Sequence, residues 1–106
     1  MNVHLTRDSV AMSDDVDAPH DFRFVVPDNT SLVLLLYIVR QLSYLATSAG
    51  GKATWVASVD GKAVAVLAQQ WQEPVFLSTP VLDFNVALHF EYYQQQDPQA
   101  IVDALY

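Results

Sequence analysis

The sequence contains no cysteine, and this absence excludes a disulfide framework, thiol catalysis and a thiolate metal site. It also fits a reducing compartment, so we expect a cytoplasmic protein. Glycine is almost as scarce, with three residues in 106, and there is no Gly-rich loop that could cradle a phosphate. The longest apolar run, residues 32–39, is far short of the roughly 20 residues of a membrane span. Because the N-terminus also lacks the basic and apolar regions of a signal peptide, we expect a soluble chain without membrane association.

Basic residues are few as well, since five Lys and Arg stand against twelve Asp and Glu and give a net charge of −7. A surface of this sign repels phosphate backbones, so direct nucleic-acid binding is not expected. It suits a positively charged protein or a cation. All the acidic residues except Glu73 and Glu91 are Asp, which favours caps and turns and therefore places the charge mainly on loops.

What is present is enough apolar material for one core. The chain is 52% hydrophobic, and its length is typical of a single domain, residues 1–106. Alternation and turn signals predict the order β-β-α-β-β-(β)-β-α. This order indicates an α+β fold, with an antiparallel or mixed sheet of about five to six strands, one long helix packed on a face and a short C-terminal helix. The expected elements are strands at 2–7 and 22–26, a helix at about 31–45, strands at 53–59 and 62–69, a short edge strand within 71–77, a strand at 86–93 and a terminal helix after Asp97-Pro98.

The dipeptide Asp60-Gly61 is the clearest local signal, because it favours a type I′ turn between two apolar strands. A two-residue loop places Val59 opposite Lys62. It follows that Trp55 faces Val66 and that Ala57 faces Val64, with Trp55, Val64 and Val66 on the core side.

The predicted long helix is apolar on nearly every side. One stripe is expected to face the core, and it consists of Leu32, Leu35, Leu36, Val39 and Leu42. The remaining apolar positions need a cover, which is either the C-terminal helix with a curled sheet or another subunit. We favour the first interpretation.

An acidic stretch lies between Arg7 and Arg23, with no Lys or Arg inside it. Three interpretations are open: a solvated loop in which Asp residues cap turns, a docking surface for a basic partner, and a divalent-metal site. The spacing matches no EF-hand loop, so no metal is expected. The candidate partner-binding residues here are Asp8, Asp14, Asp15, Asp17 and Asp21.

Aromatic and Gln residues gather in the last third of the chain, and Trp71, Tyr93 and Tyr106 are the candidate anchors there. The alternative is that they are ordinary core aromatics beside a polar face. His4, His20 and His89 share no ligand spacing, and the chain has neither a Gly-x-Ser-x-Gly nor a His-Glu-x-x-His motif. We therefore expect no catalytic residue and no cofactor.

In size, charge and composition the whole chain resembles the bacterial immunity proteins of contact-dependent or secreted toxin systems. The acidic stretch and the aromatic, Gln-rich last third carry this resemblance. It implies a cytoplasmic binding protein that neutralises a basic toxin domain, often a nuclease, by covering its active-site or substrate-binding surface. Two alternatives remain open: a self-associating structural or regulatory domain, and a small metal-dependent enzyme. We expect the chain to be a monomer or a weak homodimer.

Overall fold

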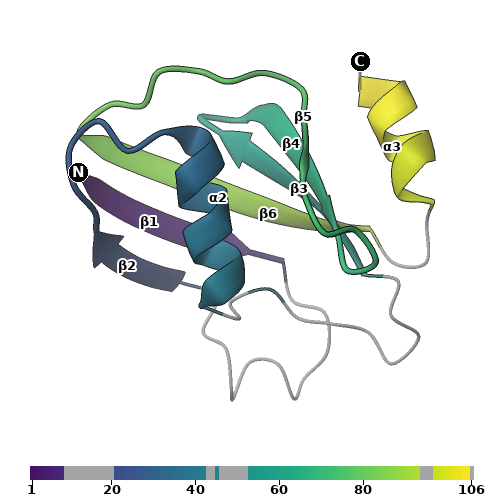
Figure 1. Cartoon of the computed structure of the whole chain (residues 1–106), viewed down its shortest axis with the longest axis horizontal. Coiled ribbons are helices and arrows are strands. Elements are labelled where there is room, and N and C mark those ends of the chain that lie inside the picture. The colour runs from purple at the N-terminus through teal and green to yellow at the C-terminus, as the bar shows by residue number, and fades with distance from the viewer. Residues whose placement is uncertain (9–20, 43–44, 46–52, 94–96, 106) are drawn as a thin grey trace.

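The computed structural model describes residues 1–8, 21–42, 45, 53–93 and 97–105. Within them the chain forms one six-stranded mixed sheet and two helices, which confirms the predicted α+β class (Figure 1). The elements are β1 (Asn2–Arg7), β2 (Asp21–Val25), α2 (Leu32–Gln41), β3 (Thr54–Val59), β4 (Lys62–Ala68), β5 (Val75–Phe76), β6 (Asn85–Tyr93) and α3 (Pro98–Leu105).

The strand order is β2-β1-β6-β3-β4-β5, and neighbours pair antiparallel except for β1 and β6. The parallel ladder runs from Asn2 opposite Asn85 to Arg7 opposite Phe90. The chain's first strand is thus an inner strand, and β2 and β5 form the two edges. Helix α2 crosses one face of the sheet, whereas α3 lies beside β4 at the other end (Figure 1).

Alternating apolar residues set the inner face of the strands, as the sequence predicted. In β6, Val86, Leu88 and Phe90 are buried while their neighbours are exposed. In β2, Phe22 and Phe24 pack against the same core as the buried Val26 that follows the strand.

Helix α2 begins where Ser31 caps it, because the Ser31 side chain accepts a hydrogen bond from the backbone N–H of Leu34. The helix ends at Gln41, so it is shorter than the predicted 31–45. Leu42 is the C-cap residue and is exposed. Its predicted core position is therefore wrong, since the helix ends here and Leu42 is 46% exposed.

The prediction that the C-terminal helix covers the outer side of the long helix is also wrong. Helix α3 packs on the opposite face of the sheet, through Ile101 and Val102. Consequently Val33, Leu34 and Tyr37 of α2 stay exposed. We call these three residues the outer stripe of α2.

The β3–β4 hairpin has the predicted type I′ turn, since Asp60 and Gly61 have φ angles of 51° and 81°. Val59 faces Lys62, as expected. The register then shifts by one residue, so that Ala57 faces Ala65. Val64 is the extra residue of a β-bulge, and its carbonyl accepts the N–H of Leu77 at 2.8 Å.

The bulge overturns the predicted partners beyond the turn. Trp55 faces Leu67, and Val66 faces Val56. Val66 therefore points to the α3 side of the sheet, and only Trp55 and Val64 of the three predicted core residues share the α2 side. A two-residue turn alone could not reveal this shift.

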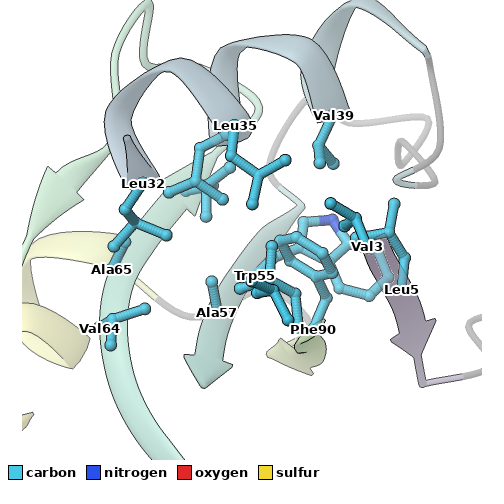
Figure 2. Close-up of a cluster of buried hydrophobic side chains, with 14 of the residues drawn as sticks. Val3, Leu5, Leu32, Leu35, Val39, Trp55, Ala57, Val64, Ala65 and Phe90 are labelled. Carbon is cyan, nitrogen blue, oxygen red and sulfur yellow. The ribbon is translucent and has the colours of Figure 1, made fainter. Parts of the chain in front are cut away.

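The core consists of two clusters that lie on opposite faces of the sheet. The larger one fills the space between α2 and the sheet, with Trp55, Phe90, Val3, Leu5 and Ala57 below Leu35 and Val39 (Figure 2). The smaller one lies under α3 and consists of Val56, Val66, Ile101 and Val102. Strands β3 and β4 are therefore buried on both faces.

Phe90 lies at the centre of the larger cluster and is 0% exposed. We expect Phe90→Ala to lower the free energy of unfolding by about 3–5 kcal/mol, because it leaves a cavity that close neighbours cannot fill. The measurement is urea denaturation. Val25→Ala is the control, since Val25 is 73% exposed and its loss should cost less than about 1 kcal/mol. Equal effects of the two substitutions would contradict this placement of the core.

Candidate functional site

The second face of the sheet is covered unevenly. Helix α3 packs there on β3 and β4, while the outward residues of β2, β1 and β6 have no helix over them among the described residues. We call this surface the open face. Its residues are Asp21, Arg23 and Val25 of β2, Asn2, His4 and Thr6 of β1, and Asn85, Ala87, His89 and Glu91 of β6.

Two shallow hollows lie on the open face. One, of about 560 Å³, is lined by residues that include Asn2, His4 and Arg23. The other, of about 410 Å³, lies beside Thr6, Ser58, His89 and Glu91, at the boundary with β3. Ala87 and Asp60 line both. The small side chain of Ala87 thus leaves a depression between larger neighbours, and Asp60, from the β3–β4 turn, stands at its rim.

Asp8 holds the end of β1 against β6. Its backbone N–H donates to the carbonyl of Phe90 at 3.0 Å, which extends the parallel ladder by one residue. Its carboxylate accepts the backbone N–H of Tyr92 at 3.0 Å and lies 3.2 Å from Nε2 of His89. Asp8, a predicted docking residue, therefore connects β1 to β6 on the open face.

His89 lies between Asp8 and Thr6, whose Oγ1 is 2.8 Å from Nδ1 of the imidazole. Because a carboxylate can only accept, Nε2 carries the proton, and in the neutral ring Nδ1 accepts the Thr6 hydroxyl. Hydroxyl, imidazole and carboxylate in this order resemble a base-activated nucleophile.

The surroundings of this group do not favour catalysis. The His89 side chain is 48% exposed, so water is not excluded from it. The ladders on both sides of β6 use the nearest backbone N–H groups of the described strands, so that these groups are not free to hold an oxyanion. We interpret the group as a polar link between β1 and β6.

Asp21 forms the matching link between β2 and β1. Its carboxylate lies 2.7 Å from Nε2 of His4 and 3.6 Å from Nε of Arg23. Both contacts are on the surface, where ion pairs contribute little to stability. Their effect is to fix the direction of the side chains along this edge of the open face.

The electrostatic character of the open face is negative. Four carboxylates, Asp8, Asp21, Asp60 and Glu91, lie on it or at its rim, and Arg23 is the one arginine or lysine among its residues. Asp60 and Glu91 were not predicted as partner-facing. The turn dipeptide predicted the place of Asp60 in the hairpin, and the alternation along β6 predicted the outward side of Glu91. Only the strand order brings Glu91 beside Asp8 and Asp60 beside Ala87.

The other predicted site residues lie away from the centre of the open face or outside the described residues. Trp71 packs against the smaller cluster, and its carbonyl accepts the Arg40 guanidinium at 2.9 Å. Tyr93 packs against the same cluster at the border of the open face, and its hydroxyl donates to Glu91 at 3.3 Å. These contacts fit the core-aromatic interpretation. Asp14, Asp15, Asp17 and Tyr106 lie outside the described residues.

Burial raises the pKa of the Tyr93 hydroxyl above its ordinary value. The negative charge of Glu91, the hydrogen bond to it and the charge of Asp8 raise this pKa further. The negative charge of the open face therefore contributes to the raised pKa of Tyr93.

Within the described ranges no group of three His, Asp or Glu is arranged to hold a metal ion. None of the helices in this part of the chain is both long and apolar enough to span a bilayer. No protein-family model matches the chain, and neither curated proteins nor solved structures give a significant match.

The raised pKa of Tyr93 predicts a loss of stability in alkali. Below the ordinary tyrosine pKa of about 10 the favourable contribution is complete, and it is lost as the pH rises through the higher pKa of the folded state. We expect Glu91→Gln to lower the Tyr93 pKa in an ultraviolet titration of tyrosinate and to reduce the alkaline loss of stability. Tyr93→Phe is the control that identifies the signal. An unchanged Tyr93 titration in Glu91→Gln would contradict the contribution assigned to Glu91 and leave burial as the main cause of the raised pKa.

Proposed function

We propose that this chain is a cytoplasmic binding protein whose open face docks on a basic protein. In line with the resemblance to immunity proteins, the partner proposed is a toxin domain, most simply a nuclease, whose active-site or substrate-binding surface the chain covers. The observation that carries the proposal is the open face itself, where Asp60 and Glu91 line shallow hollows. Asp8 and Asp21 add two further carboxylates to this surface, and Arg23 is its one arginine.

Two of these carboxylates are available to a partner. Asp60 is exposed and has no hydrogen bond or ion pair with another described residue, and Glu91 has only the 3.3 Å bond from Tyr93. Asp8 contacts His89 and the backbone of Tyr92, and Asp21 contacts His4. These two carboxylates therefore contribute to the negative potential of the open face more than to direct contacts with a partner. Carboxylates in this arrangement steer a basic partner and accept bidentate bonds from Arg.

The double substitution Asp60→Asn with Glu91→Gln tests this role while keeping the shape of the face. Asn tolerates the positive φ of position 60 as well as Asp does, and Gln can still accept the Tyr93 hydroxyl. We expect the association rate with the basic partner to fall several-fold at low salt, and the difference to shrink as salt is added. Stopped-flow or surface-plasmon measurements give both rates.

The matched control is Glu73→Gln with Asp83→Asn. It removes the same charge, but neither residue belongs to the open face. If both double variants slow association equally, net charge alone acts and the open face is not the docking surface. If neither variant does, the electrostatic part of the proposal is wrong.

The partner itself can be sought in the neighbouring reading frame. An upstream gene for a large secreted protein with a basic C-terminal domain supplies the toxin to be tested. We expect co-expression of this chain to restore growth to cells that make that domain, and calorimetry to show binding that weakens with salt. If this chain neither binds nor inhibits that domain, the toxin part of the proposal is wrong.

A self-associating domain is the second candidate function, and the outer stripe of α2 favours it. Val33, Leu34 and Tyr37 expose apolar side chains on a helix that carries no acidic residue. If this stripe is an interface between copies, Leu34→Gln with Tyr37→Ser should raise the dissociation constant of the dimer with little change in unfolding. Sedimentation velocity measures this. An unchanged sedimentation profile would exclude the stripe as the interface.

A further inference from the structure

Strand β2 is an edge strand of five residues, Asp21–Val25. It pairs with β1 on one side only. Met1 and Val26 exchange both backbone hydrogen bonds at 3.0 Å, so alternate residues of β2, Phe24 and Phe22, also direct their backbone groups toward β1. The N–H and C=O groups of Asp21, Arg23 and Val25 must then point away from the sheet.

These three residues are also those whose side chains lie on the open face. The side chains of Arg23 and Asp21 are 73% and 60% exposed, and Val25 is 73% exposed. No described residue pairs with this row of backbone groups. An edge of this kind is a template for strand addition. The other edge, β5, has only two residues and offers no comparable ladder.

We propose that β2 pairs with β2 of a second copy of this chain, antiparallel and about a two-fold axis at Phe22. In this register Asp21 stands opposite Arg23 of the second copy, and Arg23 opposite its Asp21. Both are hydrogen-bonded pairs, because Asp21 and Arg23 direct their backbone groups outward. The two sheets join into one, and the two open faces become continuous.

Charge complementarity selects this register and this occupant. An axis at Arg23 would place two guanidinium groups directly opposite each other, which destabilises a ladder. An axis at Phe24 would place Arg23 opposite Val25 and give Asp21 no opposite charge across the interface, so that its contacts would be only those with His4 and Arg23 of its own chain. The sequence Asp21-Phe22-Arg23 is complementary to itself only about Phe22. Half-buried Phe22 then meets its copy on the α2 side, so both rings lose contact with water.

A basic strand from another protein is the alternative occupant. It would bring Lys or Arg beside Arg23, and it would gain only Asp21 as an opposite charge. In the homotypic ladder, Asp21 and Arg23 of each copy both gain an opposite charge from the other copy, in addition to their contact within the chain. This proposal does not depend on the proposed function, because it uses the edge of β2 and leaves Asp60 and Glu91 free.

The net charge of −7 gives the dimer a characteristic salt dependence. Two copies repel each other over long distances, and this repulsion is screened beyond about 10 Å at 0.1 M salt. The cross-strand pairs are closer than that. Dimerisation should therefore strengthen from low to moderate salt, whereas binding of a basic partner weakens over the same range.

Sedimentation velocity from micromolar to millimolar concentration tests the proposal with a charge swap. We expect a monomer–dimer equilibrium for the native chain. Asp21→Arg puts Arg opposite Arg, and Arg23→Asp puts Asp opposite Asp, so each should raise the dissociation constant by about tenfold or more. The double variant Asp21→Arg with Arg23→Asp restores opposite charges and should restore the dimer. Leu34→Glu, on the outer stripe of α2, is the control and should leave it intact.

Hydrogen exchange of the native chain gives a test without substitutions. The backbone amides of Arg23 and Asp21 should gain protection as concentration rises, while the amide of Val25 should change less. A native chain that stays monomeric at millimolar concentration overturns the proposal. Three other results overturn it as well. These are single variants that dimerise normally, a double variant that is folded but stays monomeric, and loss of the dimer in Leu34→Glu. Basic-partner binding is measured separately with Asp60→Asn and Glu91→Gln, so failure of one proposal leaves the other standing.

Discussion

At the centre of the sheet, six residues of β1 pair in parallel with six residues of β6. The hydrogen bond between Asn2 and Asn85 and the contact between Thr6 and His89 each join residues 83 positions apart. This ladder makes β1 an inner strand, so that β2 can pair on its other side and become an edge. It also brings Asp8 to the backbone of Tyr92. Loop-closure entropy must be overcome before such distant contacts stabilise the chain, so we expect the ladder to form late in folding.

The two helices divide the sheet into unequal halves. Helix α2 seals one face with Leu32, Leu35, Leu36 and Val39. Helix α3 is short and covers only β3 and β4 on the other. The remainder of that face, β2, β1 and β6, is polar and carries the acidic groups. The position of α3 therefore decides where the open face begins, and Tyr93 marks the border.

Local signals in the sequence predicted most elements of the fold. Asp60-Gly61 and Asp97-Pro98 act on their immediate neighbours, and each connects or begins elements as predicted, while Ser31 caps the helix at its predicted start. The Asp97 carboxylate, for example, accepts the N–H of Gln99 at 3.1 Å at the start of α3. Signals of this kind need no knowledge of the rest of the chain.

Features that depend on distant partners were not predictable. The Val64 bulge depends on a bond to Leu77 beyond the hairpin, and it reversed the expected side of Val66. The choice of face for α3 exposed the outer stripe of α2. Asp8 and Asp21 were singled out for charge, but their bonds to His89 and His4 follow from strand order. Glu91 gains its place beside Asp8 in the same way.

The Val64 bulge sets how freely each half of the molecule can vary. It places Val64 and Ala65 on the α2 side in succession and lets Val66 turn to α3, so that β3 and β4 have few positions without a packed neighbour. Substitutions there must respect volume on both faces. Outward positions of β1, β2 and β6 carry no such restriction. One half of this sheet can therefore change its exposed side chains over evolutionary time while the other half keeps the domain folded.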